Sequence, residues 1–123
     1  MSASVVLYGL KNCDTCRKAL KMLGDKGIDV RLHDLRKDGL DAEMLDRWLS
    51  ALGWEVLLNK RGTTWRGLDD SLKDNLDDAG VRALLLEHPA LIKRPVSEAS
   101  GAGDTVIRVG FGKAEQAALM GEA

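Results

Sequence analysis

The sequence predicts a mixed α/β fold in which a helical segment interrupts a small sheet domain. Three observations predict it. Residues 4–36 read as a strand, a helix and a second strand. Residues 40–88 carry helical periodicity and polar loops. Residues 89–121 return to extended patterns and close with a short helix. Since the whole chain has 123 residues, these parts are expected to form one domain, residues 1–123.

The first part begins with a buried strand. The run Val5–Tyr8 is apolar and rich in β-branched residues, which is typical of a strand in a sheet interior. From Cys13 onward the apolar positions follow the period of a helix. One helical face carries Cys16, Ala19, Leu20 and Leu23. Ile28–His33 then alternates apolar and polar residues, as a second strand does. The order predicts a βαβ unit with two cysteines at its strand-to-helix turn.

The middle of the chain predicts several short helices. Asp41 can cap the first of them, with Leu40 and Leu45 placed to pack across the cap, and Gly53 ends it. Further helical patterns cover Trp54–Leu58, Leu68–Leu76 and Val81–His88. The polar segment 59–64 contains a glycine and is expected to be a loop.

The last part is expected to hold a hairpin and a helix. The residue before Pro95 is biased away from helix, so Leu91–Val96 is expected to be extended. Ser97–Asp104 is rich in Gly, Ser and Ala and predicts a turn, after which Thr105–Val109 predicts a strand. Ala114–Met120 has the pattern of a short closing helix.

This order of elements is typical of one fold class. A βαβ unit followed by a ββα unit predicts a thioredoxin-like core of the glutaredoxin type. The core is expected at about 4–36 and 89–121, with an inserted helical subdomain at about 40–88.

Composition excludes several functional classes. The hydrophobic fraction of 45% with 30% charged residues is that of a globular protein, and a net charge of −1 argues against nucleic acid as a partner. No apolar run approaches the roughly 20 residues of a membrane helix. The start of the chain, Met1–Ser4, lacks the basic region of a signal peptide. We therefore expect a cytoplasmic protein without membrane or nucleic-acid partners, and nothing demands more than a monomer.

Cys13 and Cys16 carry the strongest chemical signal. Two cysteines cannot form a disulfide framework, whereas a CxxC pair at a helix N-terminus meets unpaired N–H groups that favour a thiolate. Cys13 is expected to be the nucleophile. Cys16 points to the apolar helix face, so we expect it to be more buried and at most a resolving thiol. The alternative is that one or both are structural, since buried cysteine is common as a small hydrophobe.

A metal site is not expected. Zinc needs about four ligands, and His33 and His88 are too isolated along the sequence to complete a site with the two cysteines. The chain also lacks nucleotide and flavin motifs, so no bound cofactor is expected.

Two arginines are candidates for holding an anion. Arg61 and Arg94 stand in loop or strand-edge contexts, and a guanidinium can offer two parallel donors to a carboxylate or oxyanion. On spacing alone, a solvated surface role is the simpler interpretation. In thioredoxin-type folds, however, the loop before the third strand carries a proline that faces the reactive cysteine. Arg94-Pro95 occupies that place, where the peptide bond can be cis.

Four segments stand out when they are taken together. They are Tyr8–Ala19, Leu58–Thr63, His88–Val96 and Val109–Phe111. In this order they resemble the ArsC/Spx family across essentially the whole chain. That family holds glutaredoxin-linked arsenate reductases, Spx-type regulators and a group of small reductase-like proteins, to which the segment Gly53–Arg66 is most similar. The resemblance implies the same thioredoxin-like fold with a helical insertion.

The resemblance also implies roles for individual residues. Cys13 matches the catalytic cysteine. The expected substrate- or anion-binding residues are Lys11, Asn12, Arg61, Arg94 and Pro95. The reductases use a third arginine near the C-terminus, where this chain has Gly110, with Arg108 close by. The implied activity is a thiol reductase with glutathione as co-substrate, glutaredoxin as a further candidate partner, and a disulfide, a glutathione adduct or arsenate as substrate.

A second function competes with the reductase. Cys13 and Cys16 together also resemble the CxxC switch of Spx regulators, and Gly53 matches a glycine through which those proteins contact the RNA polymerase α subunit. Gly53 is equally explained as a helix C-cap. The charged C-terminal extension of Spx proteins has no counterpart here, which favours the enzyme. A third alternative is a family member that has lost activity and kept the fold.

Overall fold

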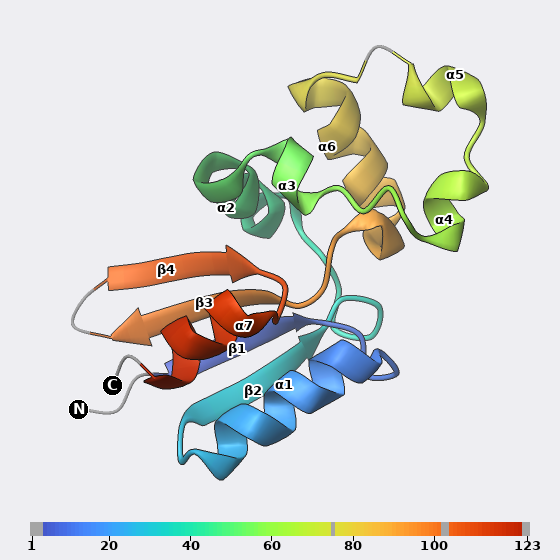
Figure 1. The fold of residues 1–123 in the computed structure, drawn as a ribbon. Helices are drawn as coiled ribbons and strands as arrows, with labels where there is room; N and C mark the ends of the chain where they lie inside the picture. Colours follow the sequence, from blue (N-terminus) through green and yellow to red (C-terminus); the bar gives the residue numbers. More distant parts are fainter. Residues whose placement is uncertain (1–3, 75, 102–103, 122–123) are drawn as a thin grey trace. The chain divides into compact units, whose positions relative to one another are not determined.

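The chain divides into two compact units (Figure 1). The computed structural model describes residues 4–74, 76–101 and 104–121. One unit runs to Gly39 and resumes at Arg94, and we call it the sheet unit. The other spans Leu40–Lys93, and we call it the helical unit.

The sheet unit contains one four-stranded sheet. Its strands are β1 (Ser4–Gly9), β2 (Asp29–Asp34), β3 (Val96–Gly101) and β4 (Asp104–Val109). They lie in the order β2-β1-β3-β4. β1 and β2 are parallel, and the β1–β3 and β3–β4 pairs are antiparallel. The helices are α1 (Asp14–Asp25) and α7 (Lys113–Gln116), and a wider turn, η2 (Ala117–Gly121), continues α7. The predicted α/β class is confirmed.

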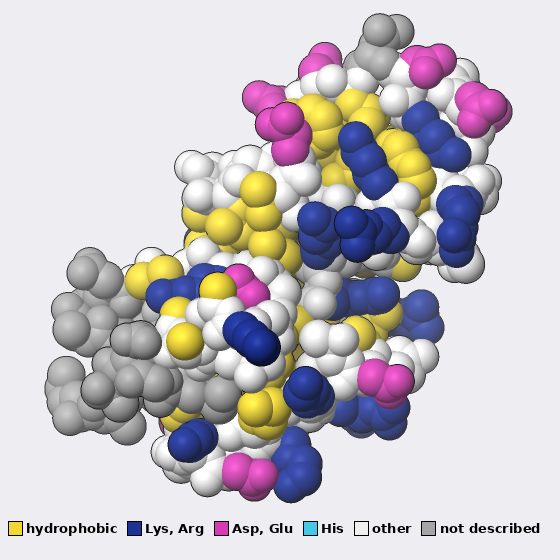
Figure 2. Space-filling model, viewed as in Figure 1, with side chains coloured by type: hydrophobic (Ala, Val, Ile, Leu, Met, Phe, Trp, Pro, Cys, Tyr) yellow, Lys and Arg dark blue, Asp and Glu magenta, His cyan; other side chains and the backbone are white. Residues whose placement is uncertain are grey.

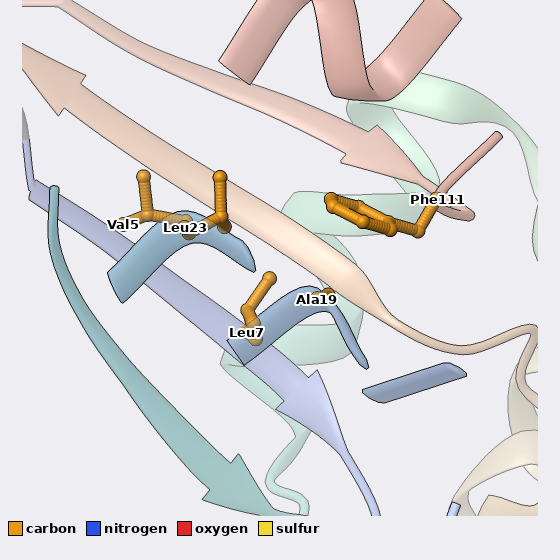
Figure 3. Packing of buried hydrophobic residues seen from close by; sticks show 5 residues of the cluster. All are labelled: Val5, Leu7, Ala19, Leu23 and Phe111. Carbon is orange, nitrogen blue, oxygen red and sulfur yellow. The ribbon is translucent and has the colours of Figure 1, made fainter. Parts of the chain in front are cut away.

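The core of the sheet unit lies between β1 and α1. Val5 and Leu7 point to the same side of β1, as alternate strand residues must, and meet Ala19 and Leu23 of α1 (Figure 3). Phe111, which follows β4, closes this cluster. A parallel β1–β2 pair requires a crossover, and α1 supplies it. The same packing therefore holds the start of α1 next to the end of β1.

The predicted C-terminal hairpin exists, but its first strand is displaced. The segment Leu91–Val96, expected to be extended, is so only in part: Leu91 ends a short 3₁₀ turn, η1 (Pro89–Leu91), Ile92 is extended and bridges to Leu58, and β3 begins only at Val96. β3 then runs through much of the expected turn Ser97–Asp104, of which 102–103 lie outside the described residues. Pairing with β1 outweighs the weak strand propensity of Ser, Ala and Gly in this run.

The helical unit consists of short helices joined by tight loops. They are α2 (Ala42–Leu52), α3 (Trp54–Leu57), α4 (Thr63–Arg66), α5 (Asp70–Lys73) and α6 (Asp78–Glu87), followed by η1. α2, α3 and α6 pack against one another around buried Leu45, Trp48 and Leu85. Asp41 caps α2 as predicted, because its carboxylate accepts the N–H of Met44 at 2.8 Å.

Two predictions in the helical unit need correction. The expected loop 59–64 ends early, because α4 already begins at Thr63. The expected helix Leu68–Leu76 is a single turn, α5, and Asn75 lies outside the described residues. Leu72 is 46% exposed, so the apolar pattern of this segment has no core to pack against. Helix formation there lacks the burial that would extend it.

The helical unit also extends beyond the expected boundary at 88. The N–H of Asn59 donates to the carbonyl of Leu91 at 2.7 Å, and the N–H of Lys93 donates to that of Leu57 at 2.8 Å. These bonds join residues 91–93 to the segment after α3. Within the part of the chain that the structure describes, no helix has the length and apolar character needed to cross a bilayer.

Candidate functional site

Cys13 is the N-cap residue of α1, directly before the first helical residue, Asp14. Its backbone is extended, with φ −88° and ψ 121°, which is the geometry of a helix N-cap. Its N–H donates to the carbonyl of Leu10 at 3.1 Å, and its carbonyl accepts the N–H of Arg17 at 3.0 Å. The side chain is half-buried. The thiol thus lies at the end of α1 where the first-turn N–H groups have no intrahelical partners.

Cys16 lies one turn further along α1 and is fully buried, at 0% exposure. Burial raises the pKa of its thiol to about 12, and a hydrogen bond with the Cys13 side chain raises it as well. A backbone hydrogen bond from Leu10 and the positive charge of Arg94 act in the opposite direction on this pKa. The prediction that Cys16 is the more buried cysteine is confirmed. At neutral pH it is a protonated thiol within hydrogen-bonding reach of Cys13.

Gly9 makes room for that buried sulfur. A Cβ atom added at Gly9 would lie 2.3 Å from Sγ of Cys16, closer than any real contact allows. In the sequence, Gly9 directly follows the apolar run Val5–Tyr8, and that position alone indicates no more than the end of a strand. A glycine directly before a reactive loop is itself a sign of close backbone approach. The end of β1 is therefore shaped to the second cysteine.

Arg94, which is followed by Pro95, lies close to the same place. Arg94 is half-buried, and its Cβ lies 3.8 Å from the position that a Gly9 Cβ would take. The Arg94-Pro95 peptide bond is cis, as the sequence predicts. Pro95 is buried, and its carbonyl accepts the N–H of Gly110 at 2.8 Å. The structure thus places a guanidinium-bearing residue beside the buried cysteine.

Asp34 holds the loop before Cys13. One carboxylate oxygen accepts the N–H of Lys11 at 3.0 Å, and the other accepts the N–H groups of Arg36 and Lys37 at 2.8 and 3.0 Å. The backbone bond from Lys37, followed by that from Lys11, lowers the pKa of Asp34 below its usual range. The sequence analysis missed Asp34. An Asp at a strand end followed by polar residues is the usual signal of such a turn.

A hollow of about 660 Å³ opens beside this loop in the sheet unit. It is lined by Lys11, Asn12, Arg17, Leu20, Leu32, Asp34, Lys37 and Asp38. Lys11 and Asn12 are exposed, and Arg17 pairs with Asp14. The volume falls within the range of small-molecule sites, about 300–1,000 Å³. The hollow therefore has room for a small polar ligand.

The other residues singled out in the sequence lie in both units. Arg61 is exposed on the loop between α3 and α4 of the helical unit, whereas the other six predicted site residues belong to the sheet unit. Arg108 is half-buried on β4, opposite Ser97. Gly110 has φ +89°, a conformation that favours glycine. Gly53 caps the C-terminus of α2, because its N–H donates to the carbonyl of Leu49 at 2.9 Å.

The site is made of thiols and basic groups. No cluster of three or more His, Cys, Asp or Glu side chains suited to a metal ion occurs among the described residues. A half-exposed thiol at a helix N-terminus, with a buried thiol and an arginine nearby, is an arrangement in which a sulfur can attack an electrophile while a guanidinium holds negative charge.

Comparisons with known proteins agree with this geometry. The sequence model of the ArsC family matches residues 8–119. An uncharacterized protein of Haemophilus influenzae is 51% identical over 92 residues, covering 75% of this chain and 81% of the relative. A solved arsenate reductase (ArsC) related protein from Brucella melitensis is 47% identical, with a TM-score of 0.72 over 96% of this chain and 93% of the other. The global transcriptional regulator Spx of Lactiplantibacillus plantarum is 28% identical, covering 75% of this chain and 70% of the regulator.

Proposed function

Because the chain belongs to the ArsC family, we propose that it is a cytoplasmic, monomeric thiol oxidoreductase whose nucleophile is Cys13. The observation that carries the proposal is the unequal pair at the start of α1. Cys13 is the accessible N-cap residue, and Cys16 is a buried thiol hydrogen-bonded to it. This arrangement supplies one attacking sulfur, Cys13, which can accept a hydrogen bond from the buried S–H group of Cys16.

The proposed reaction is reduction of a glutathione mixed disulfide. The Cys13 thiolate attacks the glutathione sulfur, a new S–S bond forms, and the substrate thiol leaves as a thiolate that takes a proton. A second glutathione thiolate then attacks the same glutathione sulfur. Cys13 is released as a thiolate and oxidised glutathione departs. One substrate thiol is freed for each glutathione consumed, and glutaredoxin is an alternative reductant for the second step.

We assign the second step to an external thiol rather than to Cys16. Cys16 is fully buried and its pKa is raised to about 12, so its thiolate is scarce at neutral pH. The rate of thiol–disulfide exchange depends on the thiolate fraction and on access to the sulfur, and both are low for Cys16. Glutathione in solution has neither disadvantage. The role left to Cys16 is that of hydrogen-bond donor to Cys13.

Arginine and lysine side chains would hold the substrate. Arg94 lies beside Cys16, where its guanidinium can attract a glutathione carboxylate or an oxyanion. Lys11 and Asn12 line the hollow beside the cysteine loop and are proposed to bind the peptide part of glutathione. Arg61 is proposed to hold substrate charge as well, on the strength of the family resemblance. Arsenate is only the second candidate substrate. It ranks below the mixed disulfide because Gly110 stands where the family resemblance places the third arginine of the reductases.

The test is turnover of a glutathione mixed disulfide by wild type, Cys13→Ser and Cys16→Ser. We expect Cys13→Ser to lose all measurable turnover while its urea midpoint stays close to that of wild type, and Cys16→Ser to keep turnover. Mass spectrometry after alkylation should find the label on Cys13 and not on Cys16 in the folded protein. Turnover by Cys13→Ser would contradict the mechanism, and loss of turnover in Cys16→Ser at unchanged stability would make Cys16 the resolving thiol.

A second candidate function is a redox-switched contact with RNA polymerase. It is favoured by the similarity to the Spx regulator and by a hollow of about 440 Å³ in the helical unit that is lined in part by Gly53, Trp54 and Arg82. Binding of the purified RNA polymerase α subunit can be measured with and without oxidant, and Gly53→Arg is the matched variant. Absence of binding in both redox states would remove this candidate.

A further inference from the structure

A cluster of two tryptophans and two lysines surrounds the loop that carries Arg61. Nζ of Lys60 lies 5.8 Å from the ring centroid of Trp54 and 5.7 Å from that of Trp65. Nζ of Lys73 lies 5.4 Å from the ring of Trp65. All three distances are within the roughly 6 Å at which an ammonium is attracted to the face of an aromatic ring. We call these four residues the tryptophan–lysine cluster.

The cluster connects separate elements of the helical unit. Trp54 begins α3, Trp65 belongs to α4, and Lys60 stands on the loop between the two helices. Lys73 comes from α5, and its side chain is only 22% exposed. Figure 2 shows basic side chains lying against a hydrophobic area on the helical unit. The ammonium of Lys60 thus bridges the helices on both sides of its own loop.

The loop itself is tightly held on its other side. Asn59 accepts the N–H of Arg61 through Oδ1 at 3.0 Å, and its own N–H donates to the carbonyl of Leu91 at 2.7 Å. A Cβ added at Gly62 would lie 3.2 Å from Nδ2 of Asn59, so the loop is closely packed there. Among the described residues, the guanidinium of Arg61 has no hydrogen-bond or ion-pair partner, so the loop backbone is what determines the point from which this side chain extends.

We propose that Lys60 is a positioning residue for Arg61. By binding both tryptophan rings, its ammonium fixes the loop 59–62, and the loop in turn fixes the backbone position from which Arg61 reaches a substrate anion. The tryptophans are then part of a loop clamp, beyond their packing role. This inference rests on the anion-binding role proposed above for Arg61.

The competing explanation is that Lys60 binds the anion directly. The two explanations differ in what the rings contribute. Removing the Trp65 ring leaves every positive charge in place, so it should not weaken a direct ion pair between Lys60 and a substrate. The same removal should loosen the loop 59–62 if Lys60 holds that loop through the two rings. Lys60→Arg keeps a cation that can lie over both rings, so a clamp tolerates it.

The experiment compares Lys60→Met, Lys60→Arg, Trp65→Leu and Arg61→Ala, with Lys26→Met as the control for loss of one exposed lysine. We expect Lys60→Met and Trp65→Leu each to raise KM for the glutathione mixed disulfide about three- to tenfold, which is the scale of one or two exposed cation–π contacts. kcat should change less than twofold. Lys60→Arg and Lys26→Met should match wild type. Neither clamp variant should raise KM further in the Arg61→Ala background.

Hydrogen exchange of the Arg61 amide supplies a readout that is independent of catalysis. Its N–H is bonded to Asn59, so loosening the loop should speed its exchange in both Lys60→Met and Trp65→Leu. Unchanged exchange in Lys60→Met overturns the clamp, as does a KM increase that adds fully to that of Arg61→Ala. If Arg61→Ala leaves KM unchanged, the proposed role of Arg61 fails, and the exchange rate alone then decides for or against the clamp. Lys60 is exposed, so Lys60→Met is expected to fold even if Trp65→Leu does not.

Discussion

Gly9 and Cys16 form a size-matched pair, and this leads to a quantitative prediction. An alanine at position 9 would place its Cβ 2.3 Å from Sγ and 3.4 Å from Cβ of Cys16. The next neighbour, Cβ of Arg94, is 3.8 Å away, which is an ordinary contact. The sulfur is therefore the atom that forbids a side chain at Gly9. Because Cys16 is fully buried against the core of the sheet unit, it cannot simply rotate into solvent.

The free energies follow from this geometry. Forcing an extra methyl group into a packed interior costs about 1–3 kcal/mol. Replacing glycine by alanine also restricts the unfolded chain, which returns about 0.4–1 kcal/mol. We therefore expect Gly9→Ala to lower the free energy of unfolding by about 1–2 kcal/mol. Cys16→Ala should lower it by about 1 kcal/mol through loss of a buried sulfur. In the double variant the clash is absent, so it should be about as stable as Cys16→Ala alone.

The assay is urea unfolding of the four proteins in reducing buffer, with midpoint and slope fitted separately. The double-mutant cycle should give a coupling energy of about 1–2 kcal/mol, in the sense that Cys16→Ala rescues Gly9→Ala. Gly24→Ala is the matched control, because a Cβ there meets nothing within 4 Å and the residue lies in α1. It should stabilise the protein by up to about 1 kcal/mol and add to Cys16→Ala. Additive effects of Gly9→Ala and Cys16→Ala, within about 0.5 kcal/mol, would refute the reasoning.

Four further predictions concern stability. The pKa of Cys16 is raised from 9.0 to about 12 in the folded chain, so the free energy of unfolding should fall as pH rises above 9.0, by at most about 1.4 kcal/mol per pH unit. Urea titrations at pH 8–11 should show this slope in the wild type, and Cys16→Ala should remove it. The pKa of Asp34 is lowered from 3.8 in the folded chain, so its carboxylate contributes to the free energy of unfolding above pH 3.8, and this contribution is lost as pH falls through the lowered pKa. Asp34→Asn should therefore weaken the pH dependence of unfolding below about pH 4 and lower the urea midpoint at pH 7. Gly110→Arg should lower the free energy of unfolding by about 1–2 kcal/mol, because φ at this position is +89°, and an unchanged urea midpoint would contradict it. Asp41→Ala should cost about 1 kcal/mol through loss of the α2 cap, whereas no change in thermal midpoint would mean that water replaces the cap fully.

The parts of the fold that depend on local pattern were predictable from the sequence. The apolar run at Val5–Tyr8 and the helical period after Cys13 predicted β1 and α1, because each element buries one continuous face. β3 was misplaced because its residues, Val96–Gly101, have little strand propensity of their own. What makes them a strand is pairing with β1 and β4, which are distant in sequence. The single turn α5 was overestimated for the opposite reason, since an apolar pattern there finds no core.

The same distinction between local pattern and long-range contact applies to the candidate site. The position of Cys13 at a helix start follows from the local pattern and could be predicted, whereas the cis bond before Pro95 was expected only from the place that Arg94-Pro95 takes in a thioredoxin-type fold. Gly9, Asp34 and Lys60 could not be assigned roles in advance. Gly9 matters because a sulfur seven residues further along the chain lies against it, and Asp34 because three backbone N–H groups converge on it. Lys60 matters because two tryptophans from different helices meet its ammonium.

The two cysteines acquire different chemistry from one structural cause. β1 ends in a residue without a side chain, and this lets α1 begin so close to the strand that its first turn buries one sulfur completely. The same turn leaves the other sulfur at the helix N-terminus, half-exposed and hydrogen-bonded to its buried partner. A side chain at Gly9 would displace the buried sulfur from the place that it occupies against the end of β1, and so alter its contact with Cys13. A bulkier residue there should therefore change which sulfur reacts with glutathione as well as the stability of the sheet unit, and mass spectrometry of the glutathione adduct in Gly9→Ala can detect that change.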